Sequence, residues 1–236
     1  MIGQLYYSSE INDEYIVLDR IESRHFSKVM RNLPESEVSI TDGLGNIYIC
    51  KYYSNQSDNL VFKVKSQIKD YNKRDYYLHI AIVPTKNIKR MEWFIEKAVE
   101  IGIDEISFIL GERSERKDIK LDRMQKISVS AIKQSKQAFL PTINKIKNFD
   151  LFISDAVETS KLIADTSQDL KNTSIHINSS QSTCVLIGPE GGFSQKEISM
   201  AKTNDFMDIS LGNTVLKSTT ALILGVGLVK MVTKQN

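Results

Sequence analysis

The stretch CVLIGPEGGFSQKE, residues 184–197, passes from an apolar run through a glycine-rich turn into a polar segment. The apolar run predicts a buried strand, and the spacing of Ser194 and Glu197 predicts a capping box at the start of a helix. The turn between them, residues 188–192, leaves backbone that a ligand can approach closely. Because open α/β sheets bind ligands at the carboxyl ends of their strands, we interpret this turn as part of a binding site. An ordinary strand-to-helix turn is the alternative.

The turn does not match the known phosphate-binding sequences. No Gly-Lys-Ser/Thr follows it, and the pattern GxGxxG is absent. The capping box also satisfies part of the amide groups at the start of the next helix, which leaves them less free to hold a phosphate. The sequence therefore favours a ligand that lies against bare backbone.

Strands and helices alternate from residue 76 onward. Predicted strands cover 76–83, 105–110, 161–166, 183–188 and 207–212, and predicted helices cover 87–102, 120–140, a segment after Ser194, and 219–232. This alternation is typical of an α/β domain with a mostly parallel sheet.

Residues 1–70 have a different pattern, of short strands and turns. Asp42-Gly43 and Gly45-Asn46 lie between β-rich runs and predict a hairpin. Residues 59–68 alternate apolar and polar side chains, as a half-buried strand does. Residues 23–31 predict one helix, capped by Ser23. The polar segment 69–75 is the predicted linker, so we expect two domains, at 1–70 and 76–236.

Composition excludes several classes of protein. The 236 residues contain no apolar run that approaches the ~18 residues of a membrane span, and the first residues do not resemble a signal peptide. Cys50 and Cys184 lie in apolar runs without His or Cys at metal-ligand spacing, and the three histidines are scattered. We therefore expect reduced thiols, no metal site and a cytoplasmic protein.

Charge is distributed unevenly although the net charge is only +2. Residues 111–147 contain 10 Lys or Arg and 4 Asp or Glu, a local excess of six positive charges. At helical spacing, the basic and polar residues of this segment form one stripe, comprising Arg123, Lys126, Ser130, Lys133 and Gln137. Such a field attracts polyanions, RNA or DNA above all, and a solvated lysine-rich face is the alternative.

Several motifs together resemble one family. They are GPEGGFS with Glu197, SLG at 210–212, RHFSKVMR at 24–31, TDGLGNIY at 41–48, PTKNIKRMEWFIEKAVEIGIDEI at 84–106, SERK at 114–117 and SAIKQS at 130–135. The chain resembles the SPOUT-class RNA methyltransferases along its whole length. Within them it is similar to the RsmE family, which methylates N3 of uridine in small-subunit (16S) ribosomal RNA.

The resemblance implies an N-terminal PUA-like β-barrel that binds RNA and a C-terminal α/β SPOUT domain with a deep trefoil knot. It also implies a homodimer and the cofactor S-adenosylmethionine, held largely by the backbone of three loops. The corresponding residues here are Ile163, Ala164, Asp165, Ile187, Gly188, Pro189, Glu190, Gly191, Leu211, Gly212, Asn213, Val215 and Leu216.

The partner that the resemblance implies is 16S ribosomal RNA or the small ribosomal subunit. We expect RNA contacts from Arg24, His25, Lys28, Arg31, Lys86, Arg90, Arg113, Arg116, Lys133 and Gln134. Most such contacts hold phosphates and set the register. The target uridine must leave its stack before it can react.

The chain departs from the family near its C-terminus. Where the family commonly reads Leu-Gly-x-Arg-x-Leu-Arg-Thr-Glu-Thr-Ala, residues 211–221 read LGNTVLKSTTA. Lys217 and Thr219 therefore occupy the positions of the second arginine and the glutamate, and they are the candidate catalytic residues. N3 of uracil carries a proton that must leave, so some group must accept it or stabilise the anion.

These departures leave other functions open. One alternative is a catalytically weakened or non-catalytic RNA-binding relative that keeps the fold. Another is a generic nucleotide-binding α/β enzyme, which would bind ATP or NAD and no methyl donor. Methyl transfer to small-subunit RNA discriminates between these hypotheses.

Overall fold

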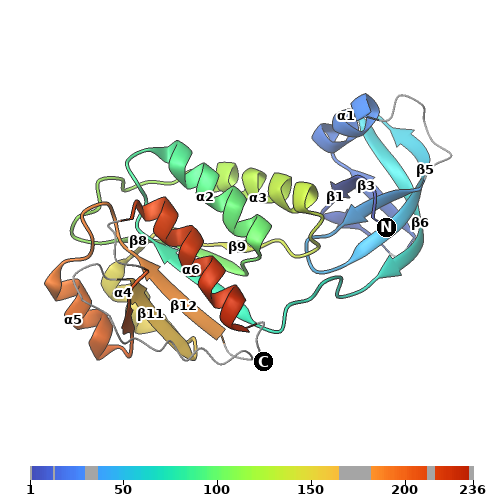
Figure 1. Ribbon diagram of the computed structural model, residues 1–236. Coiled ribbons are helices and arrows are strands. Elements are labelled where there is room, and N and C mark those ends of the chain that lie inside the picture. Colours follow the sequence, from blue (N-terminus) through green and yellow to red (C-terminus); the bar gives the residue numbers. More distant parts are fainter. Residues whose placement is uncertain (1, 13, 30–36, 165–181, 212–215, 234–236) are drawn as a thin grey trace. The chain divides into compact units, whose positions relative to one another are not determined.

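The computed structural model describes residues 2–12, 14–29, 37–164, 182–211 and 216–233 (Figure 1). The chain forms two compact units, one of Met1–Lys73 with Val129–Leu140 and the other of Arg74–Ser128 with Pro141–Asn236. The predicted roles of the two domains, RNA binding and methyl transfer, stay predictions. Among the described residues, no helix combines the length and apolar character that a membrane crossing needs.

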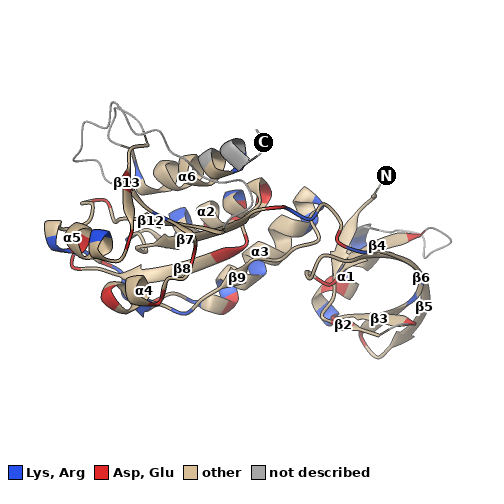
Figure 2. Ribbon diagram, turned by 90° about the horizontal axis from the view of Figure 1, so that it is seen from below, with Lys and Arg blue, Asp and Glu red and all other residues tan. Residues whose placement is uncertain are grey.

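The first unit contains a curled six-stranded sheet (Figure 2). Its strands are β1 (Leu5–Tyr7), β2 (Glu10–Ile11), β3 (Tyr15–Leu18), β4 (Val38–Thr41), β5 (Ile47–Gln56) and β6 (Asn59–Ile68), in the spatial order β1-β4-β5-β6-β3-β2. The β1–β4 pair is parallel and the other pairs are antiparallel. The predicted strand at 59–68 is confirmed.

The predicted hairpin at residues 42–46 is confirmed, because β4 and β5 pair antiparallel on either side of it. The Asp42 carboxylate holds the turn: its Oδ1 accepts hydrogen bonds from the amides of Leu44 (2.7 Å) and Asn46 (3.2 Å). Gly43 and Gly45 have φ of 75° and 104°, values that favour glycine.

The predicted cap of the first helix is wrong. Helix α1 (Arg20–Val29) begins three residues before Ser23, because Asp19 Oδ1 accepts a hydrogen bond from the amide of Glu22 at 2.8 Å. Ser23 lies inside the helix and donates instead to the carbonyl of Leu18. Phe26 is fully buried and packs edge-on against Phe62, so its predicted place on the apolar face is confirmed.

The second unit is built on a seven-stranded sheet in which every pairing is parallel, as predicted. Its strands are β7 (Tyr77–Ile82), β8 (Glu105–Leu110), β9 (Thr142–Ile143), β10 (Lys147–Asn148), β11 (Ser160–Ala164), β12 (Ser182–Ile187) and β13 (Met207–Ile209). The order is β10-β8-β7-β12-β11-β13, and β9 also pairs with β8.

Five helices accompany this sheet: α2 (Ile88–Ile101), α3 (Leu121–Ser135), α4 (Phe149–Asp155), α5 (Gln195–Thr203) and α6 (Ser218–Thr233). Helices α2 and α6 pack together over one face, and α4 and α5 cover the other (Figure 1 and Figure 2). In α6, a Cβ on Gly225 would lie at an ordinary contact distance of 3.7 Å from the Val185 side chain, because the helix packs against β12. Helix α4 was not predicted.

Helix α3 is shorter than predicted, because it ends at Ser135 rather than at residue 140. Lys136 adopts φ of 54°, which turns the chain out of the helix, and the amide of Gln137 donates to the carbonyl of Ile132 at 2.9 Å. Within α3, the residues up to Ser128 belong to the second unit, and the residues from Val129 onward belong to the first.

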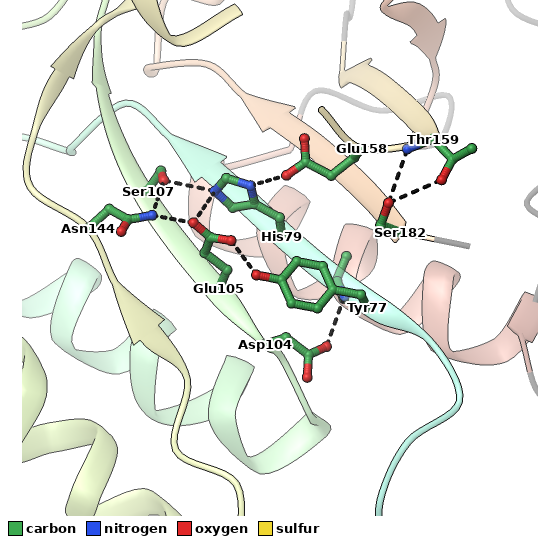
Figure 3. A network of polar contacts seen from close by, with 10 residues as sticks. Tyr77, His79, Asp104, Glu105, Ser107, Asn144, Glu158, Thr159 and Ser182 are labelled. Atoms are coloured by element: carbon green, nitrogen blue, oxygen red, sulfur yellow. Dashed lines mark hydrogen bonds and ion pairs between the residues drawn. The ribbon is translucent and has the colours of Figure 1, made fainter. Parts of the chain in front are cut away.

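A buried polar network lies at the amino-terminal ends of the parallel strands (Figure 3). His79 Nδ1 bonds Glu158 Oε1 at 2.5 Å, and His79 Nε2 bonds Ser107 Oγ at 2.8 Å. Asn144 donates to Ser107 Oγ at 2.8 Å and also to Glu105. This network joins β7, β8 and the segment before β11.

We expect Glu158→Gln to lower stability and to change its dependence on pH. Burial alone would raise the pKa of Glu158, but the hydrogen bond and the charge of His79 outweigh it and lower that pKa below 4.5. The unfolded chain therefore binds this proton at a higher pH than the folded chain does. The stabilisation is present above the unfolded-state pKa and is lost as the pH falls through the folded-state pKa.

Urea unfolding near pH 7 and near pH 4 measures both effects, with Glu10→Gln as an exposed control. Near pH 7, Glu158→Gln should lower the free energy of unfolding by about 3 kcal/mol, because it breaks a buried pair. Between the two pH values it should lose less stability than the unmodified protein. An equal loss in both would contradict a lowered pKa at Glu158.

Candidate ligand-binding site

Three neighbouring strands end together at the carboxyl edge of the second unit's sheet. Strand β11 pairs with β12 on one side and with β13 on the other, with Ile163 opposite Leu186 and Ala164 opposite Ile209. The predicted cofactor residues Ile163 and Ala164 therefore end the central strand, and Ile187 ends its neighbour. Leu211 follows β13 by two residues. The structure thus brings together the starts of the three predicted loops.

The loop after β12 is held by backbone hydrogen bonds. The carbonyl of Ile187 accepts from the amide of Val83 at 3.0 Å, and the carbonyl of Pro189 accepts from the amide of Gly192 at 2.9 Å. Gly192 has φ of 67°, so the turn itself favours glycine there. A Cβ on Gly188 would lie 3.2 Å from the amide nitrogen of Phe193, which is tighter than nearly all real contacts. The conformation of the loop therefore explains why both positions are glycine.

Nothing in the loop conformation requires glycine at position 191. Its φ is not positive, and a Cβ at this position would meet only Arg113 Cδ, at an ordinary contact distance of 3.6 Å. The residue is exposed, between two glycines that the turn requires. An exposed glycine that neither φ nor crowding requires, with only Arg113 in contact, is what a ligand lying against the backbone would need.

The predicted capping box at the start of α5 is confirmed. Ser194 Oγ accepts from the amide of Glu197 at 3.2 Å, and Glu197 Oε2 accepts from the amide of Ser194 at 2.7 Å. The second oxygen of Glu197, Oε1, accepts from the amide of Glu112 at 2.9 Å. A Cβ on Gly111 would lie 2.1 Å from that oxygen, so any other residue there would displace the Glu197 carboxylate. This contact between residues 111–112 and α5 was not predicted from the sequence.

Two predicted RNA-binding arginines contact the loop itself. Arg113 donates to the carbonyl of Gly191, and Arg90 lies 3.5 Å from the Glu190 carboxylate. Both side chains come from other segments, Arg90 from α2 and Arg113 from the loop after β8. They therefore orient the loop, and their contacts with RNA stay predictions.

Arg116 and Lys86 lie around the segment that follows β7. The Arg116 guanidinium donates to the carbonyls of Thr85 (3.2 Å) and Lys86 (2.9 Å). The Lys86 ammonium pairs with Glu115 at 3.1 Å while remaining 80% exposed. The structure thus places basic groups from 86–90 and 113–116 at the same edge of the sheet as the loop, interleaved with acidic ones (Figure 2).

The predicted catalytic residues lie at the start of α6. Lys217 precedes the helix, its side chain is exposed, and its carbonyl accepts from the amides of Thr220 (2.8 Å) and Ala221 (2.9 Å). Thr219 is only 9% exposed, so its hydroxyl is much less accessible than the lysine. Leu216, a predicted cofactor residue, is half-buried beside Lys217. Asp165, Gly212, Asn213, Val215 and Arg31 lie outside the described residues.

In the first unit, predicted RNA-binding residues lie along α1. Arg24 and Lys28 are exposed, and His25 is half-buried with its ring 5.8 Å from that of Tyr6. None of these three side chains forms an ion pair with another described residue.

Lys133 and Gln134 lie on the part of α3 that belongs to the first unit. Gln134 is exposed, but the Lys133 side chain is only 14% exposed and pairs with Glu22. Arg123, on the predicted basic stripe, is likewise engaged, by both carboxylate oxygens of Glu92 at 3.0 Å. The stripe is therefore partly neutralised by the protein, and RNA binding by Lys133 stays a prediction.

One buried cluster has the chemistry of metal ligands, which the spacing in the sequence did not indicate. Ligand atoms of His79, Glu158 and Cys184 lie within 4.8 Å of one another. Both ring nitrogens of His79 already bond Glu158 and Ser107, and burial raises the pKa of the Cys184 thiol, which favours its neutral form. We therefore interpret the cluster as part of the polar network.

Comparison with known proteins identifies the family. Residues 72–230 match the family model of the RNA methyltransferase domain. The ribosomal RNA small subunit methyltransferase E of Mesomycoplasma hyopneumoniae is 28% identical over 224 residues, which cover 92% of this chain and 95% of that protein.

Solved structures agree with this match. A probable rRNA-methyltransferase from Porphyromonas gingivalis is 30% identical, with a TM-score of 0.88, and the match covers 98% of this chain and 99% of that one. A ribosomal RNA small subunit methyltransferase E from Neisseria gonorrhoeae, bound to S-adenosyl methionine, has the same fold at 22% identity, with a TM-score of 0.86 and 97% of each chain covered. The edge of the sheet described above lies within the matched residues, and the chain belongs to the RNA methyltransferase domain family.

Proposed function

We propose that this protein is an S-adenosylmethionine-dependent methyltransferase that acts on N3 of a uridine in 16S ribosomal RNA. The family and the names of the relatives support the reaction class and the RNA. The observation in the structure that carries the proposal is the open backbone at Gly191, beside the ends of three neighbouring parallel strands.

The residues at this edge fit such a cofactor better than a nucleotide phosphate. The amides of Ser194 and Glu197 at the start of α5 are engaged by the capping box, so the helix has fewer amides free for an anion. No Gly-Lys-Ser/Thr sequence follows the loop. Residues 163–164, 187–191, 211 and 216 would hold the cofactor, mostly through backbone. When bound, S-adenosylmethionine supplies a methyl group on a positively charged sulfur.

We infer that Lys217 assists removal of the N3 proton. Its ammonium is exposed at the positive end of α6, where charge and helix dipole together favour an anion. A uracil that loses its N3 proton becomes such an anion, and a positioned cation stabilises it. Burial makes Thr219 a poorer candidate for direct contact with the base. Arg90, Arg113 and Arg116 would add positive charge along the path of the RNA backbone.

The finer architecture belongs to the same proposal. We infer a PUA-like barrel in the first unit and a SPOUT domain with a deep trefoil knot in the second, working as a cytoplasmic homodimer. The curled sheet and the parallel sheet support this assignment. Sedimentation of the purified protein at several concentrations tests the dimer, and a monomer at every concentration would contradict it.

The reaction itself is tested by methyl transfer from labelled S-adenosylmethionine to small ribosomal subunits that lack the modification. Mass analysis of the digested RNA should locate one N3-methyluridine. Tight binding of RNA without methyl transfer would instead favour the non-catalytic alternative, for which the altered sequence at 214–219 is the motivation.

We expect Gly191→Ala to lower affinity for S-adenosylmethionine at least about tenfold, and Gly191→Val to abolish binding, because each added side chain occupies the space of the ligand. Folding stability should change by less than about 0.5 kcal/mol in the alanine variant, since its Cβ meets no crowded atom. Calorimetric titration measures the affinity.

Gly192→Ala is the matched control for this experiment. It should cost about 1 kcal/mol of stability, because its φ of 67° is unfavourable for other residues. Unchanged affinity in Gly191→Val would remove this loop from the cofactor site.

We expect Lys217→Met to lower kcat about 100-fold while leaving affinity for S-adenosylmethionine unchanged, because the variant loses a charge that acts on the reacting base. Single-turnover methyl transfer measures the rate, and Lys196→Met, on the exposed side of α5, is the control. A rate equal to that of the control would exclude Lys217 from the reaction.

A further inference from the structure

A row of residues paired across β3, β6 and β5 carries an unusual combination of side chains on the outer face of the first unit's sheet. Tyr15 of β3 pairs with Lys63 of β6, and Lys63 pairs in turn with Lys51 of β5. Directly paired residues point to the same side of a sheet. The next pairs along these strands, Ile16 with Phe62 and Phe62 with Tyr52, point into the core. Tyr15, Lys51 and Lys63 therefore lie together on the outside.

The two lysines face each other without a counter-ion. Both are exposed, and within the described residues neither forms an ion pair. Like charges directly opposite each other on adjacent strands are destabilising. Arg20 and Lys73 of the same unit, by contrast, pair with Asp58 at 2.9 Å and with Asp70 at 3.2 Å.

Protection of a sheet edge does not explain these lysines. Charged residues often guard edge strands against unwanted pairing. However, β5 and β6 lie inside the sheet, each with a neighbour on both sides (Figure 1). The unpaired charge on the outer face therefore calls for a different explanation.

A β-bulge adds a second tyrosine to this face. The register passes from Tyr52 opposite Phe62 to Ser54 opposite Val61, which leaves Tyr53 as the extra residue. Bulges redirect a side chain. Here the Tyr53 ring lies 5.0 Å from that of Tyr15 at an angle of 54°, and Tyr53 remains 58% exposed. The neighbouring Tyr53 phenol group raises the pKa of Tyr15.

A second irregularity in the same pair of strands leaves Lys65 as the extra residue of β6. Lys65 is exposed and, among the described residues, is also without an ion pair. We call Tyr15, Lys51, Tyr53, Lys63 and Lys65 the tyrosine–lysine face. It combines three exposed cations with an aromatic pair in which Tyr53 is exposed and Tyr15 is half-buried.

We propose that the tyrosine–lysine face binds a single-stranded segment of RNA, with an unpaired base stacked on Tyr53 and phosphates on Lys51 and Lys63. Stacking on aromatic side chains together with a positive surface is how proteins hold single strands without sequence preference. A duplex hides the faces of its bases, so it would use the lysines but not the tyrosine. The inference rests on the proposed function for the nature of the polymer, and it adds a surface outside the predicted contacts of α1.

The test uses the full-length protein and a fluorescent single-stranded oligoribonucleotide of about 12 nucleotides, titrated over a range of salt concentrations. Each phosphate contact on a single strand contributes about 0.7 to the slope of log affinity against log salt. Lys51→Ala with Lys63→Ala should therefore lower the slope by about 1.4. Lys73→Ala, whose lysine is paired with Asp70, is the matched control and should leave the slope unchanged.

The tyrosine is tested separately. Tyr53→Ala should weaken single-strand binding about tenfold with little change in the salt slope, whereas Tyr53→Trp should retain binding. Neither variant should weaken binding of a duplex of the same length. Thermal unfolding of each variant verifies that the fold is intact, and the tryptophan variant keeps an aromatic ring in the bulge.

Three results would overturn the proposal: an unchanged salt slope in the double lysine variant, unchanged single-strand affinity in Tyr53→Ala, or equal losses for single strand and duplex in Tyr53→Ala. Methyl transfer is measured on the same samples, so that the two proposals fail separately. If the protein methylates RNA but its variants bind RNA normally, only the proposal for the tyrosine–lysine face fails. If the variants lose RNA binding but the unmodified protein never methylates RNA, only the proposed reaction fails.

Discussion

Parallel pairing of β11 with β12 on one side and with β13 on the other is the constraint on which the candidate site depends. Parallel strands require long connections, so their carboxyl ends come from distant parts of the sequence. Here the pairing brings the strand ends at residues 164, 187 and 209 to one edge of the sheet. A ligand at that edge meets backbone from several directions, and a ligand held mainly by backbone needs such convergence.

Protein contacts engage several polar groups around this edge before any ligand binds. The Glu197 carboxylate accepts from the amide of Ser194, the N-cap of its own helix, and from that of Glu112, and Arg113 donates to the carbonyl of Gly191. These contacts hold the loops in place and leave few free amides for a phosphate. The remaining feature is the open side of Gly191, which favours a ligand recognised by shape over one recognised by charge.

Elements with local signals could be predicted from the sequence. Gly102 ends α2 with φ of 111°, and Ser194 with Glu197 starts α5, as their residue types indicate. Contacts between distant residues could not be predicted: Lys133 meets Glu22 across 111 residues of sequence, and His79 meets Glu158 across 79. The end of α3 was also missed, because a lysine at positive φ gives no signal of its own. Part of the third predicted cofactor loop, residues 212–215, lies outside the described residues.

The most direct measurement is a crystal structure of the protein grown with S-adenosylhomocysteine, the demethylated form of the donor. The ligand should lie at the carboxyl ends of β11, β12 and β13, in contact with the backbone of residues 187–191 and on the open side of Gly191. Density for the ligand elsewhere, or an edge closed by its own side chains while the ligand is present in excess, would contradict the assignment of this edge as the methyl-donor site.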